Sequence, residues 1–455
     1  MASRITAKGL AEATPAARDR YVDLLRVASL GTVVLGHWLM AAVTVAEGDR
    51  RVEMGNLLAV QPGLQVLTWV LQVMPVFFFV GGFSHALSYR SLARRTQGPV
   101  YAVFLRGRLQ RLLRPTGVFV AVWGGGALVV QAIGGEGETA GVAARLVTQP
   151  LWFIGIYLAM VAFTPPLLRL HQRYGWAAFA ALVAAAAAVD VLRFVAGVPY
   201  AEFLNFAFVW LAVHQLGFLR ADGRLRRPAL LAGGGLAGAV ALVGLGPYPL
   251  SMVGMPGERI SNMAPPTLAL LCHGMWLVGA VELLRGPGTR LVARPRAWRA
   301  VVAANGIAMT AFLWHLTAML AVYAALLAAG VTPPVPASTA WWAQAPLRLA
   351  AAAVVTALLV TVFRRAERPP ATGPTATRRL GGPVAAAGVT LALLGVLGLS
   401  LVGFGGLWHG HTALLVAVPV TAPAAVLMTV GGWGLVELAA RVRAGHDARH
   451  GMLEE

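Results

Sequence analysis

Two side chains with the chemistry for proton transfer lie near the start of the chain, at Arg26 and His37. They are eleven residues apart, so on a helix they share one face, about 16 Å apart along the axis. An imidazole can take the proton of a hydroxyl as a general base, or attack a carbonyl itself as a nucleophile. Asp23 precedes Arg26 by three residues and is expected to orient it. The spacing therefore makes His37 a candidate catalytic residue.

The same residues also allow a structural interpretation. Asp23 and Arg26 can form a surface ion pair, and His37 can bond a neighbouring helix. Three more histidines lie in apolar runs, where each can relay a proton or hold two helices together; they are His214, His273 and His315. For each of these the structural role is favoured. His315, beside Trp314, is nevertheless a second candidate site residue, which could position the group whose hydroxyl gives up its proton.

A basic run forms the third candidate. In the segment 106–115 three arginines, Arg108, Arg111 and Arg114, recur every three residues and so lie on one side of a helix. Guanidinium groups bind phosphates with two parallel hydrogen bonds, so the run can hold the phosphates of coenzyme A. The alternative is a contact with anionic lipid headgroups.

The elements that must position these residues are membrane helices. The chain is 58% hydrophobic and 12% charged, which does not describe a water-soluble surface. Its apolar runs are about 20 residues long, enough for a helix to cross a bilayer. The predicted spans are 22–46, 63–88, 113–133, 150–168, 176–196, 202–219, 228–245, 264–284, 300–328, 338–363, 383–403 and 412–436.

The positive charge of the chain follows the membrane topology. The formal net charge is +19, which could indicate a nucleic-acid partner, but thirty of the 37 lysines and arginines fall in the two termini and in alternate loops. Basic residues concentrate on the cytoplasmic side of membrane proteins. We therefore expect twelve helices, both termini in the cytoplasm and no nucleic-acid partner.

Several reaction classes have no support in the sequence. It holds no glycine-rich phosphate loop, no HExxH or CxxC motif and no GxSxG. The one cysteine, Cys272, lies in an apolar run and is expected to serve packing. We expect no metal and no permanently bound cofactor.

Taken together, these segments resemble the acyltransferase-3 family of bacterial membrane proteins, over roughly residues 18 to 365. The segments that carry the resemblance are RDRYVDLLRVASLGTVVLGHW (18–38), QVMPVFFFVGGFSHALSYR (72–90), RGRLQRLLRP (106–115) and PLWFIGIYLAMVAFTPPLLRLH (150–171). VWLAVHQLGFLRADG (209–223) and MTAFLWHLTAML (309–320) add to it. The first segment is the most specific, because the family places an arginine and a histidine on its first helix at this spacing.

The resemblance implies a catalytic role for His37, with Arg26 as its functional companion and Arg108, Arg111 and Arg114 as a basic cluster near the donor. The chain departs from the family where Gly81 replaces the serine of a frequent Ser-Gly-Phe motif. We also expect no C-terminal hydrolase-like domain of the kind found in some members, and therefore no acyl-transfer step handled by such a domain.

The resemblance also divides the chain. We expect a cytoplasmic tail (1–21), an acyltransferase-3-like domain of about ten helices (22–363), a cytoplasmic linker (364–382), an accessory helix pair (383–440) and a cytoplasmic tail (441–455).

The implied activity is that of a plasma-membrane enzyme that moves an acyl group, expected to be acetyl, from cytoplasmic acyl-CoA. The acceptor is a hydroxyl of an extracytoplasmic glycan, lipid or metabolite, and membrane lipids are the other expected partners. A transporter or flippase is the alternative, because it too would have twelve helices and buried ionisable residues.

Overall fold

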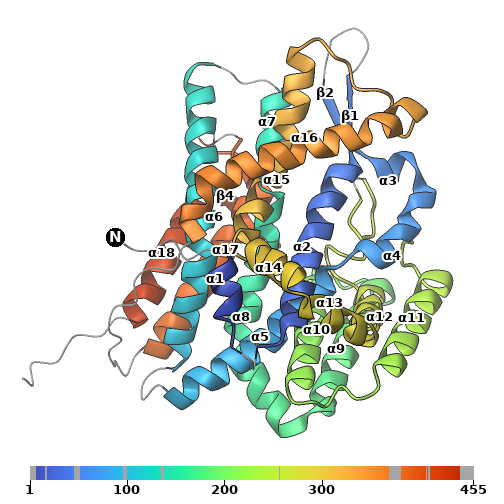
Figure 1. The fold of residues 1–455 in the computed structure, drawn as a ribbon, viewed down its shortest axis with the longest axis vertical. Helices are drawn as coiled ribbons and strands as arrows, with labels where there is room; N and C mark the ends of the chain where they lie inside the picture. The colour runs from blue at the N-terminus through green and yellow to red at the C-terminus, as the bar shows by residue number, and fades with distance from the viewer. Residues whose placement is uncertain are drawn as a thin grey trace, which may run out of the picture.

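The computed structural model describes residues 7–15, 18–45, 52–95, 100–134, 138–255, 257–367, 381–405, 407 and 410–440. Within these ranges the chain is mostly helical (Figure 1), and 11 helices are long and apolar enough to cross a membrane. A further pair, α12 (Leu268–Leu283) and α13 (Arg285–Ala293), forms a candidate span bent by 52°. The protein is therefore an all-α polytopic helix bundle, as predicted.

The candidate spans follow the predicted order. Each long apolar run forms a helix, because in a bilayer only a helix can hydrogen-bond its own backbone over that length. They contain α2 (Arg20–Met40), α5 (Met74–Arg95), α6 (Val100–Ala132), α8 (Gln149–Tyr174), α9 (Trp176–Phe194), α10 (Asn205–Ala221), α11 (Pro228–Leu245), α12 with α13, α15 (Ala308–Ala328), α16 (Thr339–Phe363), α17 (Gly381–Val402) and α18 (Ala422–Ala440). Shorter helices join them: α1 (Ala7–Glu12), α3 (Leu57–Val60), η1 (Pro62–Leu67), α4 (Thr68–Leu71), α7 (Glu138–Leu146), η2 (Ala201–Leu204), α14 (Pro295–Asn305) and η3 (Arg364–Glu367).

Three predicted span limits are wrong. The first span ends early, because Ala41–Val45 forms strand β1, paired antiparallel with β2 (Val52–Asn56). The last begins late, because β3 (Thr412–Leu415) and β4 (Val418–Thr421) form a hairpin before α18. The ninth begins at α15, since α14 is a separate helix. Valine and threonine keep the hydropathy high while favouring strands, so an apolar run alone cannot distinguish the two structures.

Two glycines bring α5 and α10 into backbone contact. A Cβ added to Gly82 would collide with the carbonyl of His214, and one added to Gly217 would collide with the carbonyl of Phe79. Membrane helices lack a hydrophobic force between them and associate through such close packing of small residues. Gly82 of the Gly81-Gly82 pair thus serves the contact with α10, whereas a Cβ at Gly81 would meet the Tyr157 side chain of α8.

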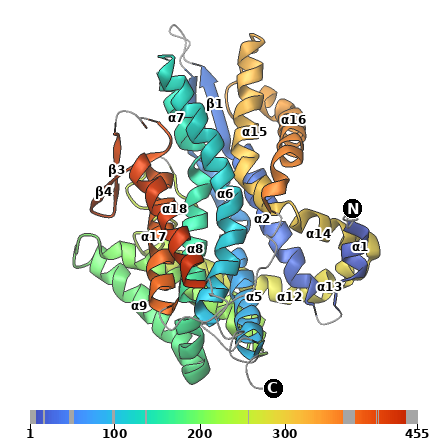
Figure 2. The same ribbon diagram turned by 90° about the vertical axis from the view of Figure 1, so that its left-hand side faces the viewer.

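Helices α17 and α18 pack against α6 and α8 (Figure 2). Glu437 of α18 accepts hydrogen bonds from Arg106 (2.8 Å) and Gln110 (2.5 Å) of α6. The pair predicted as accessory is thus joined to the basic segment 106–115. Residues 368–380 of the predicted linker and the tail 441–455 lie outside the described residues.

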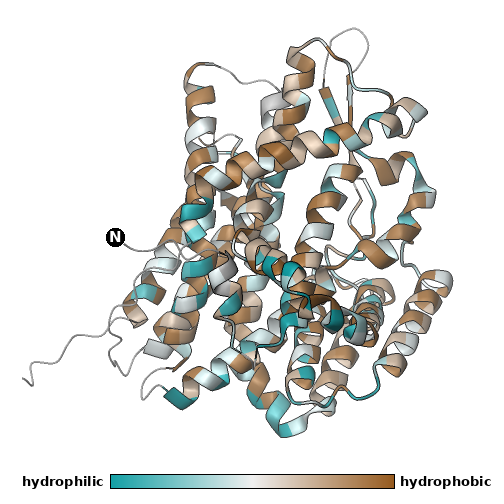
Figure 3. Ribbon diagram, viewed as in Figure 1, coloured by the Kyte–Doolittle hydropathy of each residue, from teal (hydrophilic) through white to brown (hydrophobic). Residues whose placement is uncertain are grey.

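The two ends of the bundle differ in chemistry. At the end where α2 begins and α5 ends, here called the arginine end, Asp19 binds Arg220 (3.2 Å) and Arg285 (2.9 Å). The opposite end, here called the hairpin end, carries β1 and β2 (Figure 1). Between them the outer faces are largely apolar (Figure 3); Leu347 of α16, for example, is 74% exposed. That pattern suits contact with lipid chains.

Candidate active site

The structure brings His37 of α2 and His315 of α15 together inside the bundle. His37 Nδ1 lies 2.7 Å from His315 Nε2, and the two rings are nearly parallel, at 15° with centroids 5.0 Å apart. His315 is fully buried, whereas His37 is partly exposed. The neighbouring Trp38 donates from Nε1 to the carbonyl oxygen of His315 (2.9 Å), which holds α2 against α15.

The partners of the pair fix which ring nitrogens carry protons. His315 Nδ1 lies 2.5 Å from the carbonyl oxygen of Phe312, which can only accept, so this nitrogen is the donor. In a neutral imidazole the other nitrogen is then an acceptor, so His315 Nε2 accepts from His37 Nδ1–H. The same rule leaves a lone pair on His37 Nε2. That lone pair is what a general base or a nucleophile requires.

Arg26 is held in place nearer the arginine end of the same helix. It donates to Asp23 (3.0 Å), so the predicted i,i+3 pair is present, and to the hydroxyl of Ser84 on α5 (2.8 Å). Asp23 is buried and also accepts from Arg18 (2.6 Å). Its two guanidinium partners satisfy the buried carboxylate, and Arg26 thereby gains a defined orientation.

Two of the three arginines in the basic run line one cavity. The cavity, of about 330 Å³, lies between α5 and α6 toward the arginine end, and Arg108 and Arg111 contribute to its wall together with Arg95, Ser88 and Ser91. Its lining residues include no carboxylate. A cationic pocket without an internal counter-ion suits a phosphate ligand. Arg114, the third predicted member, is not in the wall.

A buried polar chain that the sequence analysis missed lies beside these arginines. Thr164 of α8 donates to the carbonyl of Met160 (2.7 Å), so its oxygen accepts from His85 (3.4 Å) and His214 (3.2 Å). The other nitrogen of His85 accepts from the hydroxyl of Tyr157 (3.1 Å). Tyr157 and Arg26 both interact electrostatically with Arg108. An ionisable group in an apolar span is itself a functional signal, and it would have identified His85.

Two further predicted or considered residues lie apart from the histidine pair. The ring of Trp314 stacks on Phe363, with centroids 4.0 Å apart, and meets Phe119 edge-on. His273 binds the carbonyl of Trp69 (3.1 Å), a contact that joins two segments of the fold. Both side chains have packing partners that account for their positions. Within the ranges that the structure describes, no group of three or more His, Cys, Asp or Glu side chains could hold a metal ion.

The fold and this interior define a multi-pass membrane protein whose polar side chains meet between helices far apart in sequence. Residues 19–365 match the family model described as an acyltransferase domain. The chain therefore belongs to the acyltransferase-3 family, as its resemblance to that family implied. No curated protein and no solved structure matches it.

Proposed function

We propose that the protein transfers an acyl group, acetyl by expectation, from cytoplasmic acyl-CoA to a hydroxyl of an acceptor on the other side of the plasma membrane. The observation that carries the proposal is the contact between His37 and His315, whose hydrogen-bond partners assign the proton of His37 to Nδ1 and so leave its Nε2 unprotonated. The acyltransferase family of the chain supplies the reaction class.

The reaction needs a base, and His37 has the right tautomer for it. Nε2 takes the acceptor's hydroxyl proton while the oxygen attacks the thioester carbonyl. The tetrahedral intermediate then collapses, the carbon–sulfur bond breaks, and the CoA thiolate takes the proton back from the imidazolium. Through its bond to Nδ1–H, His315 stabilises the positive charge that His37 carries in between.

The same lone pair allows a covalent route. His37 Nε2 would attack the thioester, expel CoA and carry the acyl group to the acceptor hydroxyl. Rapid acid quenching of the enzyme mixed with acetyl-CoA alone, followed by mass spectrometry, separates the two routes. An acetyl adduct on the peptide that contains His37 supports the covalent route, and its absence during active turnover supports the general-base route.

The donor is expected to enter from the arginine end. Arg108 and Arg111 would hold the phosphates of coenzyme A in the cavity between α5 and α6, leaving the pantetheine arm to extend toward His37. The excess of basic residues in that end's loops supports its placement in the cytoplasm, where acyl-CoA is made. Both chain termini would lie on that side.

The test is CoA release in lipid nanodiscs. Purified protein is mixed with labelled acetyl-CoA, with and without a pool of cell-envelope glycans, and His37→Ala is compared with wild type. We expect acceptor-dependent release to fall by about 10²- to 10⁴-fold in the variant, the usual contribution of a catalytic base. His273→Gln is the matched control, a buried intramembrane histidine outside the pair, and should stay active.

Two results would contradict the proposal. Normal CoA release by a folded His37→Ala protein would show that His37 takes no part in the reaction. No release from any acyl-CoA by folded wild type would favour the transport class instead.

A further inference from the structure

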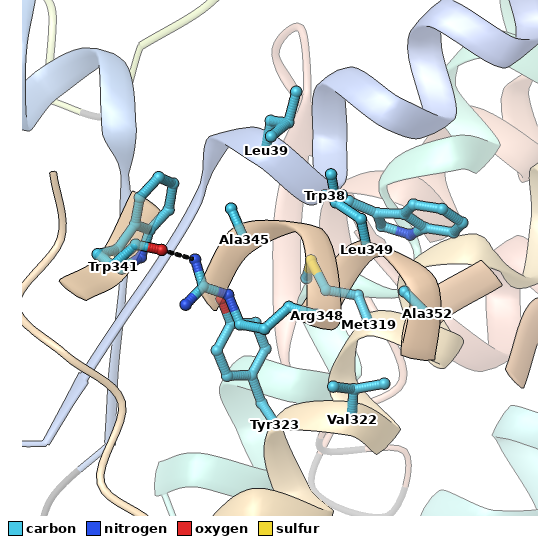
Figure 4. Close-up of a pocket in the computed structure, with 10 residues that line it drawn as sticks. All are labelled: Trp38, Leu39, Met319, Val322, Tyr323, Trp341, Ala345, Arg348, Leu349 and Ala352. Carbon is cyan, nitrogen blue, oxygen red and sulfur yellow. Dashed lines mark hydrogen bonds between the residues drawn. The ribbon is translucent and has the colours of Figure 1, made fainter. Parts of the chain in front are cut away.

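Glu437 is the one ionisable side chain in α17 and α18, the two helices that follow the matched residues 19–365. It lies in the candidate membrane span that α18 forms, where a carboxylate carries a free-energy cost and is by default a functional signal. Arg348 of α16 is likewise charged within a span, but its hydrogen bond to the Trp341 carbonyl (3.0 Å) stays in its own helix (Figure 4). Glu437 instead binds a second helix, α6.

Three donors satisfy the Glu437 carboxylate, and two of them belong to α6. Arg106 donates from Nε to one oxygen (2.8 Å). The side-chain amide of Gln110 (2.5 Å) and the indole of Trp433 (3.3 Å) donate to the other oxygen. The carboxylate thus links the last helix of the described chain to the basic segment that carries the proposed donor-binding arginines.

The partners of Glu437 lie on the face of α6 opposite the cavity between α5 and α6. At 3.6 residues per turn, Gln110 is about 40° from Arg106 around the helix. Arg108 is about 160° from Arg106, and Arg111 is about 140° from it. The cavity wall contains Arg108 and Arg111 but neither partner of Glu437. A contact on one face of α6 therefore fixes the rotation that turns the other face toward the cavity.

Pro115 interrupts the hydrogen bonds of α6 just beyond these arginines. It lies inside the helix, four residues after Arg111, and has no N–H to donate to the Arg111 carbonyl. Beyond Pro115, α6 is held by Phe119, whose ring packs edge-on against α15 with centroids 5.3 Å apart. The missing hydrogen bond weakens the connection through which that packing orients the basic segment. The contact with Glu437 acts on the segment directly.

The helix pair is itself anchored to the rest of the bundle. A Cβ added to Gly155 of α8 would meet the Leu397 side chain of α17 at 2.5 Å. One added to Gly432 of α18 would collide with the backbone of Ala392 in α17. Close contacts of this kind between small residues hold membrane helices together. Helix α18 is thereby fixed to the acyltransferase domain through α17.

We propose that Glu437 is a positioning residue for the donor, which holds the basic segment of α6 so that Arg108 and Arg111 face the cavity. This inference rests on the proposed function for the donor, acyl-CoA. It gives the last two helices a role in the enzyme, as the support of the helix that binds the donor's phosphates.

The test measures CoA binding by isothermal titration calorimetry, with the protein in phosphatidylcholine nanodiscs. Glu437→Ala should weaken CoA binding about five- to ten-fold, within the usual range for coupling between two sites. Glu437→Gln should lose less affinity, because its amide oxygen can still accept from Gln110. Leu438→Ala, a change on the exposed neighbour, should bind CoA like wild type.

Two readouts separate positioning from stability. A contact that only stabilises the fold would lower the unfolding temperature and the number of CoA sites per protein, while the Kd of the folded fraction stays unchanged. In a Pro115→Ala background α6 can make the missing hydrogen bond, so Glu437→Ala should cost less affinity there than in wild type. An equal loss of affinity in both backgrounds overturns the positioning role.

The remaining outcomes distinguish this inference from the proposed function. Unchanged CoA affinity in folded Glu437→Ala, together with weaker binding by Arg108→Gln, overturns the positioning role and leaves the donor site standing. Equal affinity in wild type and Arg108→Gln, or no CoA binding by folded wild type, contradicts the donor site itself and the positioning role with it.

Discussion

Replacement of His315 by alanine tests whether its ring fixes the tautomer of His37 or only packs against it. The change removes the acceptor of the His37 Nδ1–H bond, which is 2.7 Å long and made to a fully buried ring. When His37 takes the hydroxyl proton this bond becomes one from a charged donor, and such bonds contribute about 1.5–3 kcal/mol. The expected loss in kcat/KM is therefore roughly 10- to 150-fold.

The assay is acceptor-dependent CoA release at several acetyl-CoA concentrations, with folding checked by thermal unfolding. The loss should fall on kcat, while the KM for acetyl-CoA stays unchanged, because the cavity proposed for the donor lies between α5 and α6, away from His315. His315→Gln should recover part of the activity, since its amide oxygen can accept from Nδ1–H. A folded alanine variant with kcat/KM within about two-fold of wild type would refute the role, since an effect that small is worth less than a typical hydrogen bond. So would a glutamine variant no better than alanine.

Three further predictions follow from other contacts. Arg108→Gln should lower kcat/KM for acetyl-CoA about ten-fold, because it removes one guanidinium from the cavity proposed for the donor's phosphates. Gly82→Ala should lower the thermal unfolding temperature, since the added methyl collides with the α10 backbone. Asp222→Asn should cost about 1 kcal/mol of stability at neutral pH, measured by chemical unfolding, because Asp222 binds Arg90 at 2.5 Å.

The surroundings of Asp222 determine how its contribution to stability changes with pH. Burial alone would raise its pKa, but hydrogen bonds from Arg90 and His171 outweigh burial and lower the pKa below its ordinary value. A lowered carboxyl pKa stabilises the fold above the unfolded value, near 4, and that stability is lost as pH falls through the folded value. The difference between Asp222→Asn and wild type should therefore shrink in acid.

Each of these predictions has a result that contradicts it. An unchanged kcat/KM for acetyl-CoA in Arg108→Gln would contradict binding of the donor's phosphates in this cavity. Gly125→Ala is the control for Gly82→Ala, because its added methyl meets nothing within 4 Å, and equal unfolding temperatures of the two variants would refute the packing argument. A stability difference for Asp222→Asn that does not begin to shrink as the pH falls below the unfolded pKa of the carboxyl, near 4, would show that charge is not its cause.

The bundle was predictable because the bilayer allows few alternatives. A chain crossing hydrocarbon must satisfy its own backbone, so each apolar run of sufficient length was identified in the correct order. The shared face of Arg26 and His37 follows from helical periodicity alone. The strand at Ala41–Val45 could not be predicted in this way. Its apolar residues fit a helix or a strand until the pairing with Val52–Asn56 is known.

The sequence pattern could not predict which side chains the site residues contact. His37 and His315 are 278 positions apart, and no periodicity indicates that their rings meet. Arg108 and Arg111 differ from Arg114 only by their direction about α6, which decides which of them reaches the cavity. His85 differs from these residues, because an ionisable side chain inside the predicted span 63–88 is a functional signal that the sequence itself carries.

In the proposed reaction a neutral imidazole serves a donor that carries several charges. If the donor's phosphates bind at Arg108 and Arg111, their charges are held away from His37, toward the arginine end. The groups that react, a thioester and a hydroxyl, are themselves uncharged and can enter the low-dielectric interior at little desolvation cost. Binding free energy from the remote phosphates is then available to align the thioester and the hydroxyl on Nε2. On this reasoning, a donor lacking its phosphates should lose kcat as well as affinity. Acetyl-pantetheine tested against acetyl-CoA measures that loss directly, and an equal kcat for the two donors would show that the phosphates contribute binding alone.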